Sequence, residues 1–289
     1  QSVEQLIRNQ QVVCSSHIAS SKLRQATGGV LLFGGALMLE ESIRAYMAAR
    51  GSVFEARVFD CVDSTNTVLA ALARSGAPEF TAVIAGAQTA GRGRGEHRFF
   101  SPAGCGVYFS LLLRPRFPAV TAARLITPAC AVAAARAIER ASGEAAGIKW
   151  VNDVFLRGRK VCGILTEAAP DAAGGLAWVI PGIGINVTPP PGGYPPEIAS
   201  TAGAVFPDAA PEDAAAKLAV DTLDALIGLY KAMPEQRFHA EYLSRLTLLG
   251  REVSLPDGVH GTVTGIDTDF RLLVSSGGKQ LALDSGEIT

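Results

Sequence analysis

The sequence predicts a mixed α/β domain followed by a small all-β module. Up to Gly250, segments with the spacing of amphipathic helices alternate with short apolar runs typical of buried strands. After Gly250 the pattern changes to short alternating strands separated by turn residues. The 289 residues are 48% hydrophobic, which is enough apolar material for one large domain or two. We therefore divide the chain into an unassigned extension, a large domain and a terminal module, at residues 1–38, 39–249 and 250–289.

The first half of the large domain combines helices and strands. Acidic residues open a helix over 39–50, and a cluster of N-cap residues followed by Gly76 predicts a helix over 65–75. A long alanine-rich helix is expected at 119–142, where Pro128 should kink or split it. The strands expected in this half, which are apolar or alternate in polarity, are residues 53–62, 81–87 and 107–115.

The second half begins with two expected strands within residues 148–168, joined by a tight turn at 157–159. A further strand is predicted at 176–187, and a proline-rich loop follows it. Amphipathic helices are expected at 211–231 and 234–249. Strands therefore supply the middle of the chain, and helices close the large domain.

Composition argues against several classes of protein. The net charge is −1, so no general basic field attracts nucleic acid, and we expect DNA binding to be absent. The longest apolar run, residues 28–39, is too short to span a bilayer, so no membrane partner is expected. The five cysteines are odd in number and scattered, with no CxxC and no Cys/His cluster. This pattern predicts free thiols in a reducing cytoplasm, not disulfides or zinc, and no residue is assigned as a metal ligand.

Residues 91–100, GRGRGEHRFF, are the first candidate for binding chemistry. Glycines let backbone N–H groups approach a ligand closely, and the arginine guanidinium suits carboxylate and phosphate. Arg92 and Arg94 therefore predict a mobile flap over an anionic ligand. A solvated surface loop, or an RG-type segment that binds nucleic acid, would explain the same residues.

Short polar residues form a second candidate. Ser64, Thr65 and Asn66 open a predicted helix, where capping is the ordinary explanation and contact with a neutral polar ligand is the other. Gln88 follows an apolar strand just before the flap, and it could be a plain loop residue.

Charged residues form a third candidate. Lys149, Asp153 and Lys160 come from neighbouring predicted strands and could converge on a nucleotide phosphate and its Mg²⁺. An ordinary edge-strand charge is the alternative for Lys160. Cys162 is predicted to be a core thiol rather than a nucleophile. No GxxxxGK[ST] loop occurs, which argues against a P-loop fold.

Five motifs in order resemble those of the biotin protein ligases, the biotin–[acetyl-CoA-carboxylase] ligase family. They are DSTN, QTAGRGR, SPAGCGVYFSLLLRP, KWVNDVFLRGRKVCGILTE and GIGINV. The resemblance covers about residue 39 to the C-terminus. It implies an α+β fold of the class II synthetase-like type, with a mixed β-sheet flanked by helices. It also implies that residues 39–249 are catalytic and that residues 250–289 form a small SH3-like β-barrel.

The resemblance further implies a two-step reaction with ATP and Mg²⁺ as cofactors. Biotin and ATP give biotinyl-5′-AMP and pyrophosphate, and the biotinyl group then passes to a lysine of a biotin carboxyl carrier protein or domain. The implied catalytic residues are Lys160, Arg92, Asp153 and Lys149. Those implied to bind biotin are Ser64, Thr65, Asn66, Gln88, Arg92, Gly93, Arg94, Lys160, Gly163 and Gly184. Those implied to bind the nucleotide are Arg94, Lys149, Asn152, Asp153 and Asn186.

The chain departs from the family pattern in the outer half of the flap. The family loop usually runs GRGRxGRxW, whereas Glu96, His97 and Phe99 stand here in place of Gly, Arg and Trp. Glu96 should weaken the positive field of the flap. About 35 residues precede the match, which is fewer than the roughly 60 of a winged helix, so we do not expect repression.

Two alternatives remain. A lipoate or octanoate ligase or transferase shares the superfamily fold, and an octanoyltransferase needs a reactive cysteine. A biotin-responsive DNA-binding repressor belongs to a different class of function. A homodimer stays open as well.

Overall fold

The computed structural model describes residues 35–95, 97–233, 235, 237–255, 259–284 and 286. Nearly all of the extension expected at residues 1–38 lies outside this part of the chain. The helix expected at 39–50 is present as α2 (Gly35–Arg50), four residues longer at its start.

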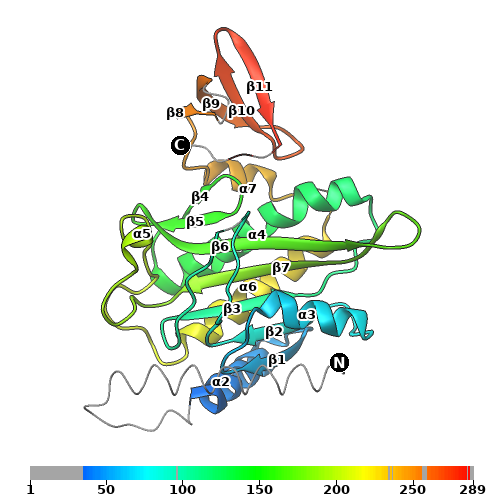
Figure 1. Cartoon of the computed structure of the whole chain (residues 1–289), viewed down its shortest axis with the longest axis vertical. Coiled ribbons are helices and arrows are strands. Elements are labelled where there is room, and N and C mark those ends of the chain that lie inside the picture. Colours follow the sequence, from blue (N-terminus) through cyan, green and yellow to red (C-terminus); the bar gives the residue numbers. More distant parts are fainter. Residues whose placement is uncertain are drawn as a thin grey trace.

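A seven-stranded mixed sheet organises the large domain, in the order β1-β2-β3-β7-β6-β5-β4. β1 and β2 are parallel, and every other neighbouring pair is antiparallel. This arrangement confirms the α+β class with a mixed sheet flanked by helices (Figure 1). The strands are β1 (Glu55–Phe59), β2 (Thr81–Ala85), β3 (Gly106–Leu111), β4 (Gly147–Lys149), β5 (Asp153–Leu156), β6 (Arg159–Pro170) and β7 (Leu176–Asn186).

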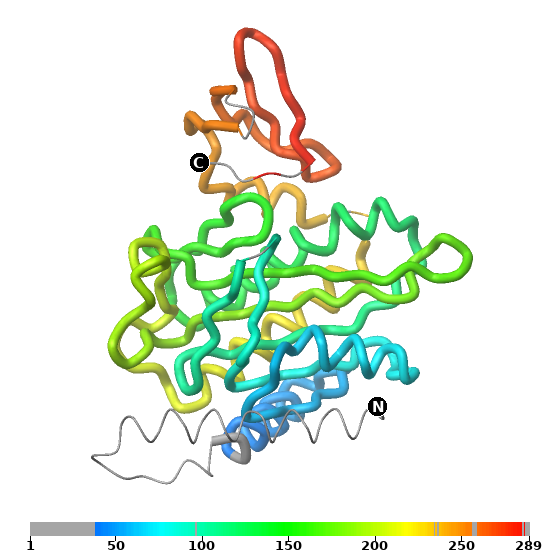
Figure 2. Tube along the Cα trace, in the orientation of Figure 1, coloured from blue at the N-terminus to red at the C-terminus, as the bar shows by residue number. Residues whose placement is uncertain are grey.

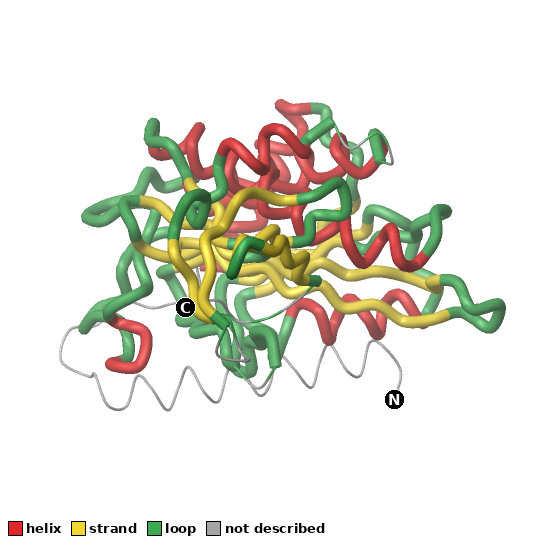
Figure 3. Tube along the Cα trace, turned by 90° about the horizontal axis from the view of Figure 1, so that it is seen from above, coloured by secondary structure: helices red, strands yellow, loops and turns green. Residues whose placement is uncertain are grey.

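Helices cover both faces of this sheet (Figure 3). On one face α4 (Ala119–Ser142) and α6 (Ala214–Lys231) pack against each other and on the middle strands. On the other face α3 (Thr65–Arg74) packs on β2, β3 and β7. The alanines in the middle of α4, between Ala129 and Ala135, are fully buried, which lets the helix lie close to α6 and the sheet. Although α4 is long and apolar enough to cross a membrane, it is thus the central core helix.

Three expectations about these elements need correction. α4 continues through Pro128 without a break, so the predicted split is wrong; Pro128 is buried in the core, whose packing offsets the lost hydrogen bond. Residues 148–168 contain three strands rather than two, because Ile148 pairs with Val154 in the short strand β4. The helix expected at 234–249 shrinks to α7 (His239–Ser244). The residues after α7 pair with β4 instead. Leu246 forms a β-bridge with Ile148, and Thr247 N–H donates to the carbonyl of Ile148 (2.9 Å).

The turn between β5 and β6 agrees with expectation. Arg157 and Gly158 have φ values of 51° and 72°, the left-handed pair that a two-residue type I′ hairpin requires. The turn brings Leu156 opposite Arg159. Lys160, the second residue of β6, therefore lies at a defined position opposite Phe155 of β5.

The terminal module forms a separate four-stranded antiparallel sheet. Its chain trace lies beyond one end of the large domain (Figure 2). Phe270 anchors it to the large domain by stacking on Phe238 and meeting Tyr242 edge to face. The indole N–H of Trp150 donates to the carbonyl of Phe270 (2.8 Å). The strands, in the order β11-β10-β9-β8, are β8 (Glu252–Ser254), β9 (His260–Ile266), β10 (Leu272–Ser276) and β11 (Lys279–Leu283).

The cysteines agree only partly with the expectation of free thiols. Cys105, Cys130 and Cys162 are free and buried. Cys61 is disulfide-bonded, so the expectation is wrong for this residue.

Candidate active site

A cavity of about 820 Å³ lies on the sheet between the N-terminus of α3 and the start of β6. Strand alternation explains why β6 and β7 line it. Cys162 and Ile164 belong to the core cluster that includes α4, so Gly163 and Leu165 face the opposite side of the sheet. All residues that the sequence analysis assigned to the site line this one cavity. They are Ser64, Thr65, Asn66, Gln88, Arg92, Gly93, Arg94, Lys149, Asn152, Asp153, Lys160, Gly163, Gly184 and Asn186.

Glycines form the floor of the cavity. Gly163 and Gly184 are direct partners across β6 and β7, and the ring of Phe99 lies over both. A Cβ atom on Gly182 would collide with the carboxamide of Asn66. The floor must therefore lack side chains if the flap and the start of α3 are to approach the sheet.

Neutral polar groups form one end of the cavity. Ser64, Thr65 and Asn66 are each 5% exposed or less. Ser64 makes no side-chain capping bond to α3; instead Gln88 Oε1 accepts from the backbone N–H of Thr65 (2.9 Å). The structure therefore departs from the capping explanation for Ser64. Gln88, on a different segment, satisfies one of the free N–H groups at the start of the helix.

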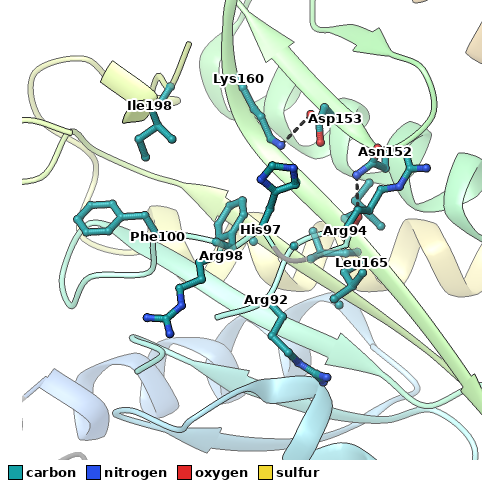
Figure 4. Close-up of a pocket in the computed structure, with 18 of the residues that line it drawn as sticks. Arg92, Arg94, His97, Arg98, Phe100, Asn152, Asp153, Lys160, Leu165 and Ile198 are labelled. Atoms are coloured by element: carbon teal, nitrogen blue, oxygen red, sulfur yellow. Dashed lines mark hydrogen bonds and ion pairs between the residues drawn. The ribbon is translucent and has the colours of Figure 1, made fainter. Parts of the chain in front are cut away.

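Charged groups form the other end. Lys160 Nζ lies 2.7 Å from Asp153 Oδ2, and Asp153 Oδ1 is buried with no hydrogen-bond partner within the described part of the chain. Arg94 Nη1 donates to Asn152 Oδ1 (3.4 Å), and Asn152 Nδ2 donates to the carbonyl of Ile164 (3.0 Å). The predicted convergence of Asp153 and Lys160 is thus realised, whereas Arg92 points away from that pair (Figure 4).

The flap is a small hairpin that crosses over the glycine floor. Gly93 N–H donates to the carbonyl of His97 (2.7 Å), and Phe99 N–H donates to that of Gly91 (3.0 Å). Arg92 Nη2 reaches Glu167 Oε2 at 2.7 Å. The departure at residue 96 lies outside the described residues. The departure at Phe99 has a clear consequence, because its ring is the part of the flap that contacts the floor.

Sequence reasoning missed one wall of the cavity. Tyr194, Ile198, Thr201 and Ala202 line it, although their proline-rich segment carries only loop signals. Backbone bonds from Lys160 N–H to the carbonyl of Thr201 (2.8 Å) and from Gly203 N–H to that of Lys160 (2.9 Å) hold this wall against β6. No local pattern encodes such long-range pairing.

Other chemistries find less support. Burial raises the pKa of the Cys162 thiol well above its ordinary value, and the side chain faces the core, so the expectation of a core thiol is confirmed. Across residues 35–286, as far as they are described, no three His, Cys, Asp or Glu side chains are grouped to hold a metal ion.

Comparisons with known proteins agree with this geometry. A family model described as "Biotin/lipoate A/B protein ligase family" matches residues 58–186. The biotin–[acetyl-CoA-carboxylase] ligase of Mycobacterium tuberculosis is 31% identical over 262 residues, which are 86% of this chain and 94% of that protein. The chain belongs to the biotin protein ligase family.

Other relatives in the biotin protein ligase family match different shares of the chain. The bifunctional ligase/repressor BirA of Bacillus subtilis is 43% identical over 139 residues, which are 48% of this chain and 42% of that protein. The chain thus spans less than half the length of that relative. The structure of the Aquifex aeolicus biotin protein ligase in complex with biotin and ATP has a TM-score of 0.67 at 27% identity, over 81% of this chain and 97% of that one.

Proposed function

We propose that the protein is an ATP-dependent ligase that activates biotin as biotinyl-5′-AMP and transfers it to one lysine of a biotin carboxyl carrier domain of the acetyl-CoA carboxylase type. One observation carries the proposal. A single cavity joins a neutral polar end at α3 to a cationic end at Lys160 across a floor without side chains. The membership of the family supports the same activity.

The neutral end suits the ureido ring of biotin. That ring offers two N–H donors and one carbonyl, and it needs a few polar partners within an otherwise apolar pocket. Ser64, Thr65 and Gln88 supply hydroxyl and carboxamide groups there. None of the three carries a charge, so the pocket does not select for an ionised group at this end.

The cationic end suits the carboxylate and the α-phosphate. Attack of the biotin carboxylate on the α-phosphorus brings two anions together, and the oxygens of phosphorus gain negative charge in the transition state. Lys160 and Lys149 offset that charge, and Arg94 adds a further cation from the flap. Pyrophosphate then leaves, and the mixed anhydride stays in the cavity.

A magnesium ion fits the same end. Asp153 is the only carboxylate among the described residues that line the cavity, and its Oδ1 atom has no hydrogen-bond partner there. Mg²⁺ bound with a nucleotide uses one or two carboxylates and the phosphates, and it keeps several waters. Asp153 would hold it, with the carboxamide of Asn152 beside it. When bound, the ion neutralises phosphate charge.

The second step needs protection from water. The lysine amine of the carrier attacks the carbonyl carbon of the adenylate, and AMP leaves with the electrons of the broken C–O bond. Water attacks the same carbon, so the flap over the floor excludes it until the carrier arrives. We place this reaction in the cytoplasm, where ATP and the carrier are available.

The free cysteines in the described part of the chain argue against the octanoyltransferase alternative. Cys105, Cys130 and Cys162 are buried, and none of them lines the cavity. A lipoate ligase needs no cysteine, and it differs only in the acid that the cavity accepts. The test must therefore compare the two acids directly.

The deciding experiment is intact-mass measurement of a biotin carrier domain after incubation with the protein, ATP, Mg²⁺ and biotin. We expect a gain of one biotinyl group, which requires ATP and the acceptor lysine. A carrier variant with that lysine replaced by arginine is the control. A gain with lipoate and none with biotin would move the assignment to the lipoate ligases.

A further inference from the structure

Two polar residues outside the cavity wall connect the flap to the neutral end of the cavity. They are Ser110 on β3, which is fully buried, and Glu167 on β6. The sequence analysis assigned neither to the site. Both belong to a chain of hydrogen bonds that begins at Arg92 at the start of the flap and ends at Phe99 at its end.

The first arm of this chain holds Arg92. Glu167 Oε2 accepts from Arg92 Nη2 (2.7 Å) and from Asn66 Nδ2 (2.7 Å). One carboxylate oxygen thus joins the flap to the carboxamide of Asn66, which is buried in the wall of the cavity. The second N–H of that carboxamide is used as well, because Asn66 Nδ2 also donates to the carbonyl of Leu165 (3.3 Å).

The middle of the chain has a fixed direction. Ser110 Oγ lies 2.6 Å from Asn66 Oδ1 and 2.7 Å from Thr65 Oγ1. A carboxamide oxygen only accepts, so the single hydroxyl proton of Ser110 points to Asn66. Ser110 must then accept from the hydroxyl of Thr65. Replacement of Ser110 by an apolar residue would leave Asn66 Oδ1 buried without this donor.

The second arm returns to the flap. Gln88 Oε1 accepts from Thr65 N–H (2.9 Å), and Gln88 Nε2 donates to Ser101 Oγ (3.1 Å). Ser101 Oγ donates to the carbonyl of Phe99 (2.9 Å). The flap is thus tied at both ends to the residues proposed to hold the ureido ring.

We infer that Ser110 and Glu167 are positioning residues that couple occupancy of the neutral end of the cavity to the position of the flap. The inference rests on the proposed function for the identity of the ligand, whereas this chain of hydrogen bonds is given by the contacts described above. A ligand that bonds to Thr65, Asn66 or Gln88 must share or replace bonds of this chain. Because the chain ends on the flap at Arg92 and Phe99, the change reaches both ends of it.

The test is hydrogen exchange of the peptide over residues 88–101 in the full chain, with and without biotin, in Glu167→Gln and Ser110→Ala. The matched control is Glu40→Gln. Glu40 lies 2.6 Å from Arg44 and its side chain is 35% exposed; Glu167 lies 2.7 Å from Arg92 and its side chain is 33% exposed. The two carboxylates are therefore alike in pairing and exposure, but Glu40 is on α2, away from the flap. The peptide over α6 reports global opening in every variant.

Without biotin we expect the rate of amide hydrogen exchange in the flap peptide to rise about three- to tenfold in both variants and to stay unchanged in the control. With biotin we expect dissociation of biotin to accelerate by a similar factor. Because both residues act through one chain, the double variant should show less than the product of the two single effects. Exchange of the flap equal to that of the original protein, with α6 equally protected, would overturn the inference. If the original protein binds no biotin, the proposed function fails. The comparison of hydrogen exchange in the flap between the variants and the original protein, made without biotin, still tests whether Ser110 and Glu167 hold the flap.

Discussion

The ring of Phe99 lies so close to Gly184 that a Cβ atom on this glycine would stand 2.5 Å from the Cε1 atom of the ring. The neighbouring Gly163 is equally covered, at 2.7 Å from Cε2. Such distances are shorter than any real Cβ contact. The flap can therefore rest on the sheet only because two paired strands carry glycine at the same level.

Gly184→Ala should consequently lift the flap and leave the fold intact. Overpacking of this kind costs about 1–3 kcal/mol, which we expect to appear as weaker biotin binding, by about tenfold or more, because the cavity floor is where the methyl group projects. Gly228→Ala is the control, since nothing lies within 4 Å of its Cβ and it stands in α6. Calorimetric titration with biotin gives the Kd of each variant, which should rise in Gly184→Ala and stay unchanged in Gly228→Ala. Unchanged affinity in Gly184→Ala would show that the ligand does not use this floor.

Lys160→Ala should slow formation of the adenylate far more than it weakens binding of biotin. The phosphorus centre gains charge during attack, whereas bound biotin carries only its carboxylate, so the lysine acts chiefly on the transition state. Loss of such a cation costs about 3 kcal/mol, or a hundredfold or more in rate. Single-turnover adenylate formation measures this. Lys217→Ala, which breaks another 2.7 Å lysine–aspartate pair, should be silent; equal rates in both variants would exclude Lys160 from the reaction.

Phe270→Ala should release the terminal module from the large domain. Removal of a buried phenylalanine ring costs about 3–5 kcal/mol, and this ring packs against Phe238 and Tyr242. Trp150 lines the cavity and donates to the backbone of Phe270, so we expect the KM for ATP to rise more than the Kd for biotin. Steady-state kinetics together with tryptophan fluorescence test this. An unchanged KM after a loss of stability would contradict a role for the module in use of ATP.

Acid should destabilise the contact between α4 and α7. Hydrogen bonds from Arg136 lower the pKa of Glu241 below its ordinary value, with Coulomb attraction of Arg136 and Arg245 in the same direction and partial burial opposing it. A lowered folded-state pKa means that the stabilisation is full above the unfolded-state pKa and is lost as pH falls through the folded-state pKa. Glu241→Gln should therefore cost about 1 kcal/mol at pH 7 and progressively less as the pH falls toward about 3. Urea unfolding at both values checks this, and an equal loss at both would refute it.

Local signals identified most of the elements and the members of the site. Apolar runs and turn residues predicted β5, β6 and the type I′ turn between them, because a hairpin is determined by neighbours in sequence. The same signals failed at α7, where a distant strand captures the end of an expected helix. The polar and basic residues of the site stood out because glycine, arginine and short polar side chains are unusual beside apolar strands.

The sequence by itself determined which residues could meet a ligand, what chemistry they carry and which strands are buried. Only the tertiary structure decided that Gln88, rather than Ser64, supports the start of α3, that Arg92 lies away from Lys160, and that a proline-rich segment forms a cavity wall. It also revealed the roles of Ser110 and Glu167, which look like ordinary strand residues in the printed chain. The physical reason is that propensity and alternation act over a few residues, whereas these contacts join β3, β6 and α3 across the fold, where packing of the whole sheet sets the geometry.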